Sequence, residues 1–206
     1  MAATQRDSAF INIPYDSAYE DHFLAYIAGV AAFGLIPRAT LELTGGERRL
    51  ERIFDLIAAC KYSFHDLSFV KLDRKHPATP RFNMPFELGL VIGWQRAASS
   101  DHAWFVFESL SHRIQKSLSD LNGTDPFIYG SSPAGILREI RNALARHDMQ
   151  PTAEQMLEMF EVLREDATPY VLKKTGASSV FEARPFADLV VMARQMEVVP
   201  GLPRDS

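Results

Sequence analysis

The stretch that decides the fold is His102-Ala103-Trp104-Phe105-Val106-Phe107, a nearly continuous apolar run. A run of this kind is typical of a β-strand that is covered on both faces, because a strand with one wet face alternates apolar and polar residues. Strands covered on both faces belong to parallel sheets, in which helices connect one strand to the next. On both sides of this run, strand-like and helix-like periods alternate through residue 148. The sequence therefore predicts an α/β fold.

Working outward from that run, we expect a five-stranded parallel sheet flanked by helices. The other strands are expected at residues 9–13, 35–43, 62–67 and 126–129. Helices are expected at residues 19–32, 47–60, 85–94, 114–121 and 133–147. Pro37 lies within the second strand and has no amide hydrogen for a central ladder, so this strand is expected at an edge. An edge position for the second strand predicts the flavodoxin-like order 2-1-3-4-5.

Beyond residue 148 the strand patterns disappear, and two amphipathic segments remain, at 156–163 and 186–193. We interpret residues 8–148 as the α/β domain and residues 149–206 as a helical appendage. The appendage helices either pack on the core or meet a second copy of the chain. A homo-oligomer formed through these helices is the expected assembly.

Composition limits the possible partners. The net charge is -4 and the pI is near 5.9, so clustered positive charge for binding nucleic acid is not expected. No apolar run approaches the roughly 20 residues that span a bilayer, and no leader segment is evident, so we expect a cytoplasmic protein. Cys60 is the only cysteine, and we expect it to be a small buried side chain. The histidines show no metal-ligand spacing, so no metal is expected.

Ligands of open parallel sheets bind outside the carboxyl ends of the strands. Several polar residues of this chain follow the expected strands or begin the third helix, namely Tyr15, Asp16, Asp66, Ser68, Arg81, Asn83, Glu87, Glu108 and Ser109. The third of the five helices is opened by Pro85, which has no amide hydrogen to lose in a first turn. The sequence therefore predicts a carboxylate pocket at this rim.

Glu87 is the leading catalytic candidate. It lies one turn into the helix opened by Pro85, between apolar neighbours, so its carboxyl group is expected to be partly desolvated. Burial raises the pKa of such a carboxyl group, whereas the helix N-terminus favours its anion. A carboxylate in this setting can attack or stabilise the C1 carbon of a ribose as the base departs. Alternatively, Glu87 caps its helix or pairs with Arg81.

The other candidates also carry two interpretations. Asp66 and Ser68 can bind sugar hydroxyls, or Asp66 can cap the following segment. Asp16 and Tyr15 can contact the sugar or stack on a base, or Asp16 can cap the first helix. Neighbours along a strand point to opposite faces, so His65 is expected to be packed or surface exposed rather than a partner of Asp66. The complete set of predicted binding residues is Tyr15, Asp16, Ser68, Arg81, Phe82, Asn83 and Met84.

Four stretches resemble a group of bacterial proteins that is similar to nucleoside 2-deoxyribosyltransferases and, more distantly, to TIR domains. They are Phe10-Ile11-Asn12-Ile13-Pro14-Tyr15-Asp16, Pro37-Arg38, His65-Asp66-Leu67-Ser68 and Pro80-Arg81-Phe82-Asn83-Met84-Pro85-Phe86-Glu87-Leu88-Gly89. The resemblance covers roughly residues 8 to 148. It implies that Glu87 is the nucleophile and that Asp66 holds the sugar. TIR enzymes likewise use a helix glutamate, to cleave the nicotinamide-ribose bond of NAD. The stretch Pro14-Tyr15-Asp16 departs from the first loop of both families.

From these residues and this resemblance we expect an enzyme that hydrolyses or transfers an N-glycosidic bond of a nucleoside, a nucleotide or NAD. No cofactor is required, and NAD enters only as a possible substrate. The alternative is a non-catalytic nucleotide-sensing module, since TIR-like proteins often serve in antiphage defence. A third interpretation is an interaction protein whose pocket has lost its function.

Overall fold

The computed structural model describes residues 7–42, 49–69, 72–73, 76–77, 79–80, 82–98, 100–121 and 123–196. The described residues form two compact units. We call the part within residues 1–14 and 38–131 the sheet unit, and the part within residues 15–37 and 132–206 the helical unit. In the described ranges, no helix combines the length and the apolar character that crossing a membrane requires.

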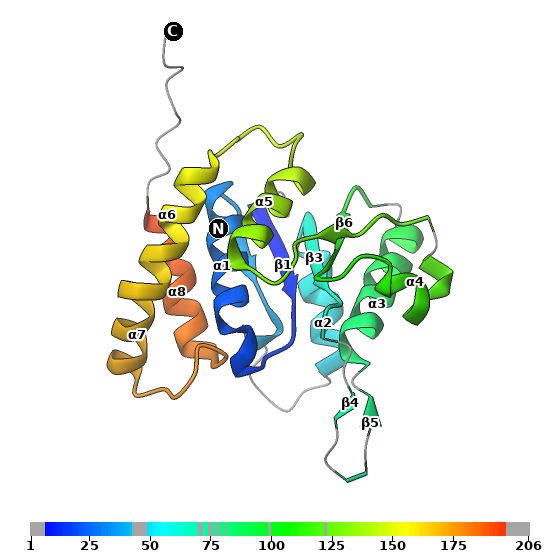
Figure 1. Ribbon diagram of the computed structural model, residues 1–206, viewed down its shortest axis with the longest axis horizontal. Coiled ribbons are helices and arrows are strands. Elements are labelled where there is room, and N and C mark those ends of the chain that lie inside the picture. Colours follow the sequence, from blue (N-terminus) through cyan, green and yellow to red (C-terminus); the bar gives the residue numbers. More distant parts are fainter. Residues whose placement is uncertain are drawn as a thin grey trace, which may run out of the picture. The chain divides into compact units, whose positions relative to one another are not determined.

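Five strands form one sheet, in the order β2-β1-β3-β6-β7 (Figure 1). β3 pairs in parallel with β1 and with β6, and β6 pairs in parallel with β7. This is the predicted flavodoxin-like parallel sheet of order 2-1-3-4-5, and the strand that contains Pro37 lies at its edge as expected. The strand bounds are Ser8–Asn12 for β1, Ile36–Arg38 for β2, Tyr62–Asp66 for β3, Ala103–Glu108 for β6 and Phe127–Ile128 for β7.

Three local predictions about strands and loops need correction. β2 is shorter than expected, because the Glu42 carboxylate accepts hydrogen bonds from the Ala39 amide and the Arg38 Nε and folds residues 40–42 into a 3-10 turn. The first half of β6 is only half-buried, because β7 pairs only with Phe107 and Glu108. Between β3 and α3, where no strand is expected from the sequence, lie two short antiparallel strands, β4 (Leu72–Asp73) and β5 (Thr79–Pro80).

Three helices belong to the sheet unit: α2 (Arg49–Ala58), α3 (Asn83–Ala98) and α4 (Arg113–Ser117). α2 and α3 share one apolar cluster with β1, formed by Phe10, Ile53, Leu56, Ile57, Cys60 and Val91. Cys60 is fully buried there, and burial raises the pKa of its thiol to about 12. The thiol is therefore protonated, as expected for a packing residue rather than a nucleophile.

The helical unit contains α1 (Glu20–Ala32), α5 (Pro133–Ala143), α6 (Ala153–Val162), α7 (Thr168–Thr175) and α8 (Ala183–Gln195). α1 packs against α5, α6 and α8. Every residue from Phe23 to Ala32 is buried. A helix that is apolar all round requires cover on all sides. Helices that follow residue 148 supply part of that cover, so they share one compact unit with α1 and α5.

α6 continues into α7 through one π-helical turn, Leu163–Ala167, so that the two helices follow one line in Figure 1. Pro169 causes this turn, because its nitrogen has no hydrogen to donate to the carbonyl group four residues earlier and its ring needs space. The Thr168 hydroxyl group donates a hydrogen bond of 2.8 Å to the Leu163 carbonyl oxygen. The sequence predicted two amphipathic segments after residue 148, and α7 is a third helix that it missed.

α1 and α5 approach each other closely at Gly29 on α1. A Cβ atom at Gly29 would lie 2.6 Å from Cδ1 of Ile140 and 3.4 Å from Cδ2 of Leu137, both on α5. At Gly93 on α3, no atom of the described residues outside the adjacent backbone of that helix lies within 4 Å of the position of a Cβ. Side-chain atoms added at the glycine on α1 must therefore displace Ile140, whereas the glycine on α3 costs helix stability without a packing reason among the described residues.

We predict that Gly29→Leu lowers the free energy of unfolding by about 2 kcal/mol through overpacking. Gly93→Ala should raise it by up to about 1 kcal/mol, because alanine is the better helix former. Urea unfolding monitored by circular dichroism measures both changes. Equal effects of the two substitutions would contradict the packing assigned to α1.

Candidate functional site

The first two turns of α3 carry three of the predicted site residues, Asn83, Met84 and Glu87. Asn83 begins the helix and is exposed, and Met84 is half-buried. Pro85 stands in the first turn as predicted. The side chain of Glu87 is buried, with 5% of the residue exposed. A carboxyl group turned into bulk solvent would have contradicted the predicted role, and Glu87 is instead withdrawn from water close to the positive end of its helix.

Two aromatic rings lie exposed at the same helix end. Phe82 is 61% exposed and Phe86 is 55% exposed, and the Phe86 amide donates to the Phe82 carbonyl oxygen. Neighbouring exposed rings can mark a ligand or interaction site, whereas single exposed apolar residues need no explanation. The two rings offer flat apolar surface on which a base can stack. Phe82 was predicted as a binding residue, and Phe86 was noted only as an apolar neighbour of Glu87. Arg81, the remaining candidate in this stretch, lies outside the described residues.

Asp66 and Ser68 lie at the carboxyl end of β3, where the sequence placed them, and both are buried. One carboxylate oxygen of Asp66 accepts a hydrogen bond of 2.9 Å from the Ser68 amide. The Ser68 hydroxyl oxygen accepts hydrogen bonds from the Ser109 amide and the Tyr129 hydroxyl group, each 2.8 Å long. The capping interpretation of Asp66 is therefore present, and Ser68 ties together the ends of β3, β6 and β7.

An ion pair completes this rim. Glu108 ends β6 with a buried carboxylate, which Arg113 binds with two nitrogens, Nε at 2.9 Å and Nη2 at 2.5 Å. Nη2 also donates to the Ser68 carbonyl oxygen. The carboxylate further accepts the amides of Ser109 and Leu110 at 2.6 and 3.2 Å. Two parallel hydrogen bonds fix the guanidinium plane, so this edge of the sheet is rigid.

A second set of buried polar residues lies on the α3 side of the sheet. Asn12, the last residue of β1, is 2% exposed. Its Nδ2 donates to Nδ1 of His65 at 2.9 Å and to the carbonyl oxygen of Met84 at 3.3 Å. Because Met84 lies one helical turn before Glu87, Asn12 links β1 and β3 to the start of α3.

The hydrogen-bond chain continues from His65 along β3. Nε2 of His65 lies 2.9 Å from the Ser63 hydroxyl oxygen, which lies 2.8 Å from Nε2 of His102. Nδ1 of His102 is 2.7 Å from the carbonyl oxygen of Cys60. A carbonyl oxygen only accepts, so His102 carries its proton on Nδ1, Ser63 donates to it, and His65 donates from Nε2. Every proton position in the chain is thereby determined.

Both imidazoles must be neutral in this arrangement, and burial favours their neutral forms. Burial, and secondarily the nearby His102, lower the pKa of His65 to about 3. Burial also lowers the pKa of His102, although the hydrogen bond to the Cys60 carbonyl opposes the shift. His65 was expected to be packed or surface exposed, and it is packed. Its place in a chain of four side chains was not predicted.

Tyr15 and Asp16 belong to the helical unit. The Tyr15 ring packs against Phe23 and Phe181, with ring centroids 6.1 and 5.6 Å apart. The Asp16 carboxylate accepts the Ala18 amide at 3.0 Å and caps the 3-10 turn that leads into α1. The capping interpretation of Asp16 is therefore present, and Tyr15 has a packing role in an aromatic cluster. The predicted contacts of both residues with a ligand stay predictions.

The sheet unit thus brings together β3 and the start of α3. Leu67, next to Asp66, and Leu88, next to Glu87, pack in one apolar cluster with Val106 and Ile114. The sequence analysis missed Asn12, Arg113 and Tyr129 as members of this region. Asn12 could have been recognised as an amide at the end of an otherwise apolar strand, at the rim where ligands bind.

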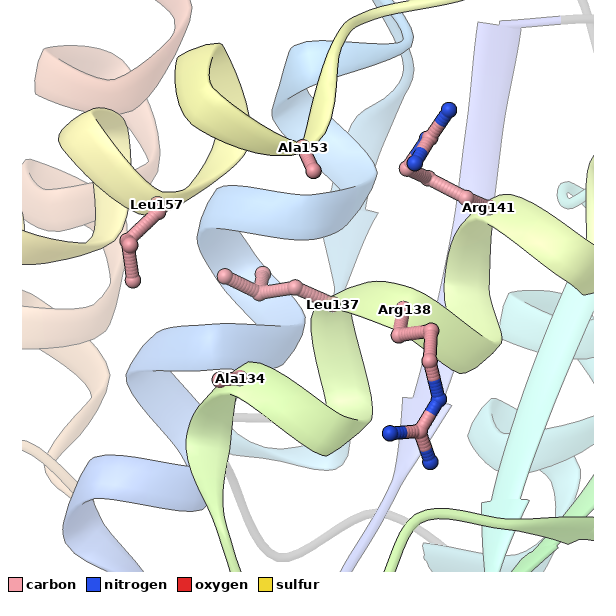
Figure 2. A pocket seen from close by; sticks show the side chains of 6 residues that line it. All are labelled: Ala134, Leu137, Arg138, Arg141, Ala153 and Leu157. Carbon is pink, nitrogen blue, oxygen red and sulfur yellow. The ribbon is translucent and has the colours of Figure 1, made fainter.

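A pocket of about 140 Å³ lies in the helical unit between α5 and α6, lined by Ala134, Leu137, Arg138, Arg141, Ala153 and Leu157. In Figure 2, Leu137 extends from α5 toward α6, whereas Arg138 and Arg141 point away from each other. The lining contains neither a carboxylate nor any of the predicted site residues. It therefore lacks the group that the predicted chemistry requires.

The neutral state of His65 makes a prediction about pH. Its pKa is lower in the folded protein than in the unfolded chain, so the unfolded state binds the proton more tightly and stability decreases as the pH falls below 6.5 toward about 3. Between pH 7 and pH 5, His65 should account for a decrease of about 2 kcal/mol in the free energy of unfolding. Denaturant titrations at several pH values measure this, and His65→Gln should have a shallower dependence. Identical slopes would contradict a neutral His65.

The ion pair at the rim makes a prediction about stability. Arg113→Met leaves the buried Glu108 carboxylate without its guanidinium partner and should cost about 2–3 kcal/mol. Arg164→Met is the matched control, because its pair with Glu165 is exposed at both ends and should leave the thermal midpoint unchanged. Thermal unfolding of both variants tests the assignment, and equal midpoints would refute it.

Comparison of the chain with models of known protein families, with curated proteins and with solved structures gave no match.

Proposed function

We propose that this protein hydrolyses or transfers the N-glycosidic bond of a nucleoside, a nucleotide or NAD, with Glu87 as the catalytic carboxylate. The observation that carries the proposal is the burial of Glu87 in the first turns of α3, at the carboxyl end of a parallel sheet. A carboxyl group withdrawn from water at the rim where parallel sheets bind ligands is a candidate for chemistry. The resemblance to deoxyribosyltransferases and TIR domains points to the same residue.

The chemistry needs no group that the chain lacks. In one form, a Glu87 oxygen bonds to C1 of the sugar while the bond from C1 to the base nitrogen breaks and its electron pair goes to the base. A nucleobase then takes up a proton from solvent, whereas the nicotinamide of NAD leaves as a neutral ring. Water or a second base then attacks C1 and releases the carboxylate. In the other form, Glu87 forms no bond and stabilises the cationic sugar until water attacks. No cofactor takes part, and NAD enters as a substrate.

The neighbouring residues have proposed positioning roles. Asp66 has one oxygen committed to the Ser68 amide, and its carboxylate is held rigidly at the end of β3. We assign Asp66 and Asn83 to the sugar, in keeping with the resemblance. Phe82 and Phe86 supply exposed rings for the base at the same helix end as Glu87. Asp16 and Tyr15 remain candidates for contacts with the sugar and base.

A non-catalytic nucleotide-sensing module is the second candidate. It is favoured by hydrogen bonds that already occupy polar groups of the rim. The Ser68 hydroxyl oxygen accepts two hydrogen bonds, and Arg113 binds both oxygens of the Glu108 carboxylate. A rim held this tightly suits recognition of a ligand without turnover. In either case we propose a cytoplasmic protein that assembles as a homo-oligomer through its C-terminal helices, where Leu157, Tyr170 and Val191 expose apolar side chains. A role in antiphage defence belongs to the sensing candidate.

Incubating the purified protein with NAD and a panel of nucleosides tests the proposal. Release of free base should decrease at least about a hundredfold in Glu87→Gln, which keeps the shape of the side chain but loses the carboxylate. Glu165→Gln serves as the control, because Glu165 is an exposed glutamate of the helical unit and its loss should not affect turnover.

The outcomes separate the candidates. Turnover that survives in Glu87→Gln would exclude Glu87 as the catalytic carboxylate. Binding of a ligand without turnover in the unaltered protein would instead support the sensing module.

A further inference from the structure

Asn12 has the features of a ligand-binding residue whose orientation is fixed in advance. It is 2% exposed, and its Nδ2 already donates to two acceptors, Nδ1 of His65 and the Met84 carbonyl oxygen. Because a carbonyl oxygen accepts and never donates, the atom facing Met84 must be the nitrogen, and the other end of the carboxamide must be the oxygen. The orientation of the amide is therefore determined by chemistry as well as by geometry.

Both hydrogen bonds of the Asn12 side chain involve Nδ2, and neither involves Oδ1. Within the described part of the chain, no residue donates a hydrogen bond to it. Asn12 Oδ1 is not among the fully buried polar atoms that lack a partner in the described residues, so it keeps contact with solvent and can accept a hydrogen bond from a ligand. The oxygen belongs to the last residue of β1, at the edge of the sheet where ligands bind.

The hydrogen-bond chain behind Asn12 holds this oxygen in place. His65 accepts from Asn12 only while its Nδ1 is free of a proton, and Ser63 and His102 enforce that state. Burial keeps both imidazoles neutral. An amide that donates through two hydrogens also becomes a stronger acceptor at its oxygen, because hydrogen bonds in a chain polarise one another.

We propose that Asn12 Oδ1 accepts a hydrogen bond from the 2-hydroxyl group of a bound ribosyl ligand, which makes the substrates ribosyl rather than 2-deoxyribosyl compounds. The inference rests on the proposed function, since it places the anomeric carbon at Glu87. Asn12 contacts the carbonyl group one helical turn before Glu87. The hydroxyl group on the carbon next to C1 is the sugar donor that stays closest to C1, so it is the one that this acceptor can reach.

The consequence is a discrimination between sugars. A 2-deoxyribosyl ligand would bury the Asn12 oxygen without a donor. Sites built around a hydroxyl group reject the analogue that lacks it much more strongly than apolar pockets reject a size change. The 3-hydroxyl group has no such partner assigned, so its removal should have a smaller effect.

The test measures binding of ribonucleosides, their 2-deoxy and 3-deoxy counterparts and NAD by titration calorimetry, with the full-length protein. Removal of the 2-hydroxyl group should weaken binding at least about tenfold in the unaltered protein and have little effect in Asn12→Ala. Asn142→Ala is the matched control, because Asn142 is an exposed amide of the helical unit that bonds to Glu139, and it should retain the full discrimination.

Several results would overturn the inference. Equal affinity for ribosyl and 2-deoxyribosyl ligands, or dependence on the 3-hydroxyl group alone, excludes the assignment while leaving Glu87 as the proposed catalyst. Discrimination that persists undiminished in Asn12→Ala excludes it as well. If no nucleoside and no NAD binds, this inference and the proposed function both fail.

A second measurement does not depend on the folding of any variant. Nitrogen-15 NMR of the unaltered protein should find His65 with its proton on Nε2, the form in which Nδ1 accepts from Asn12. A proton on Nδ1 would place the Asn12 oxygen against His65 and remove it from the ligand. That result would overturn the inference even if 2-deoxyribosyl ligands bound weakly.

Discussion

The structure of the sheet unit depends on one constraint: β3 is the middle strand of the sheet, and three of its polar side chains have no access to water. Ser63, His65 and Asp66 are each fully buried on this strand. Buried polar groups must find partners inside the protein, because an unpaired one costs on the order of 1–3 kcal/mol. On one face of the sheet, the hydrogen-bonded chain from Asn12 to His102 supplies these partners. At the end of the strand, the Ser68 amide donates a hydrogen bond to the Asp66 carboxylate.

This constraint connects packing to function through α3. The first turn of that helix is tied to the sheet by the hydrogen bond from Asn12 to the Met84 carbonyl and by the packing of Leu88 against Leu67. Glu87 follows from that turn, so its carboxyl group is positioned by the sheet and not by a mobile loop. Catalysis of glycosyl transfer requires such positioning, because a nucleophile acts only when it lies close to the reacting carbon.

The parts of the fold that depend on local chemistry were predictable from the sequence. Pro37 placed β2 at the edge, and Pro85 placed the start of α3. The apolar neighbours of Glu87 predicted its burial. The features that could not be predicted depend on the register of strand pairing and on which distant segments cover each element. Strand alternation places Ser63 and His65 on one face, but only the pairing of β3 with its neighbours shows that Asn12 and His102 meet them. Arg113 reaches Glu108 across a loop whose course no local pattern specifies.

In the helical unit, the composition of α1 bears on which segments must cover it. Residues 23–32 of α1 are nearly apolar on every side of the helix, and each of them is buried. Such a segment already implies cover from other helices. The approach of α5 and α6 to Gly29 shows where part of that cover comes from. The burial of Met156 and Met159 likewise assigns these residues to a core.

A crystal structure with a bound, non-reacting ribonucleoside analogue tests the central claim most directly. The account predicts that a carboxylate oxygen of Glu87 lies about 3–3.5 Å from the anomeric carbon, the separation of reacting atoms before bond formation. Sugar density away from the first turn of α3, with the Glu87 carboxyl group still enclosed by protein, would contradict it.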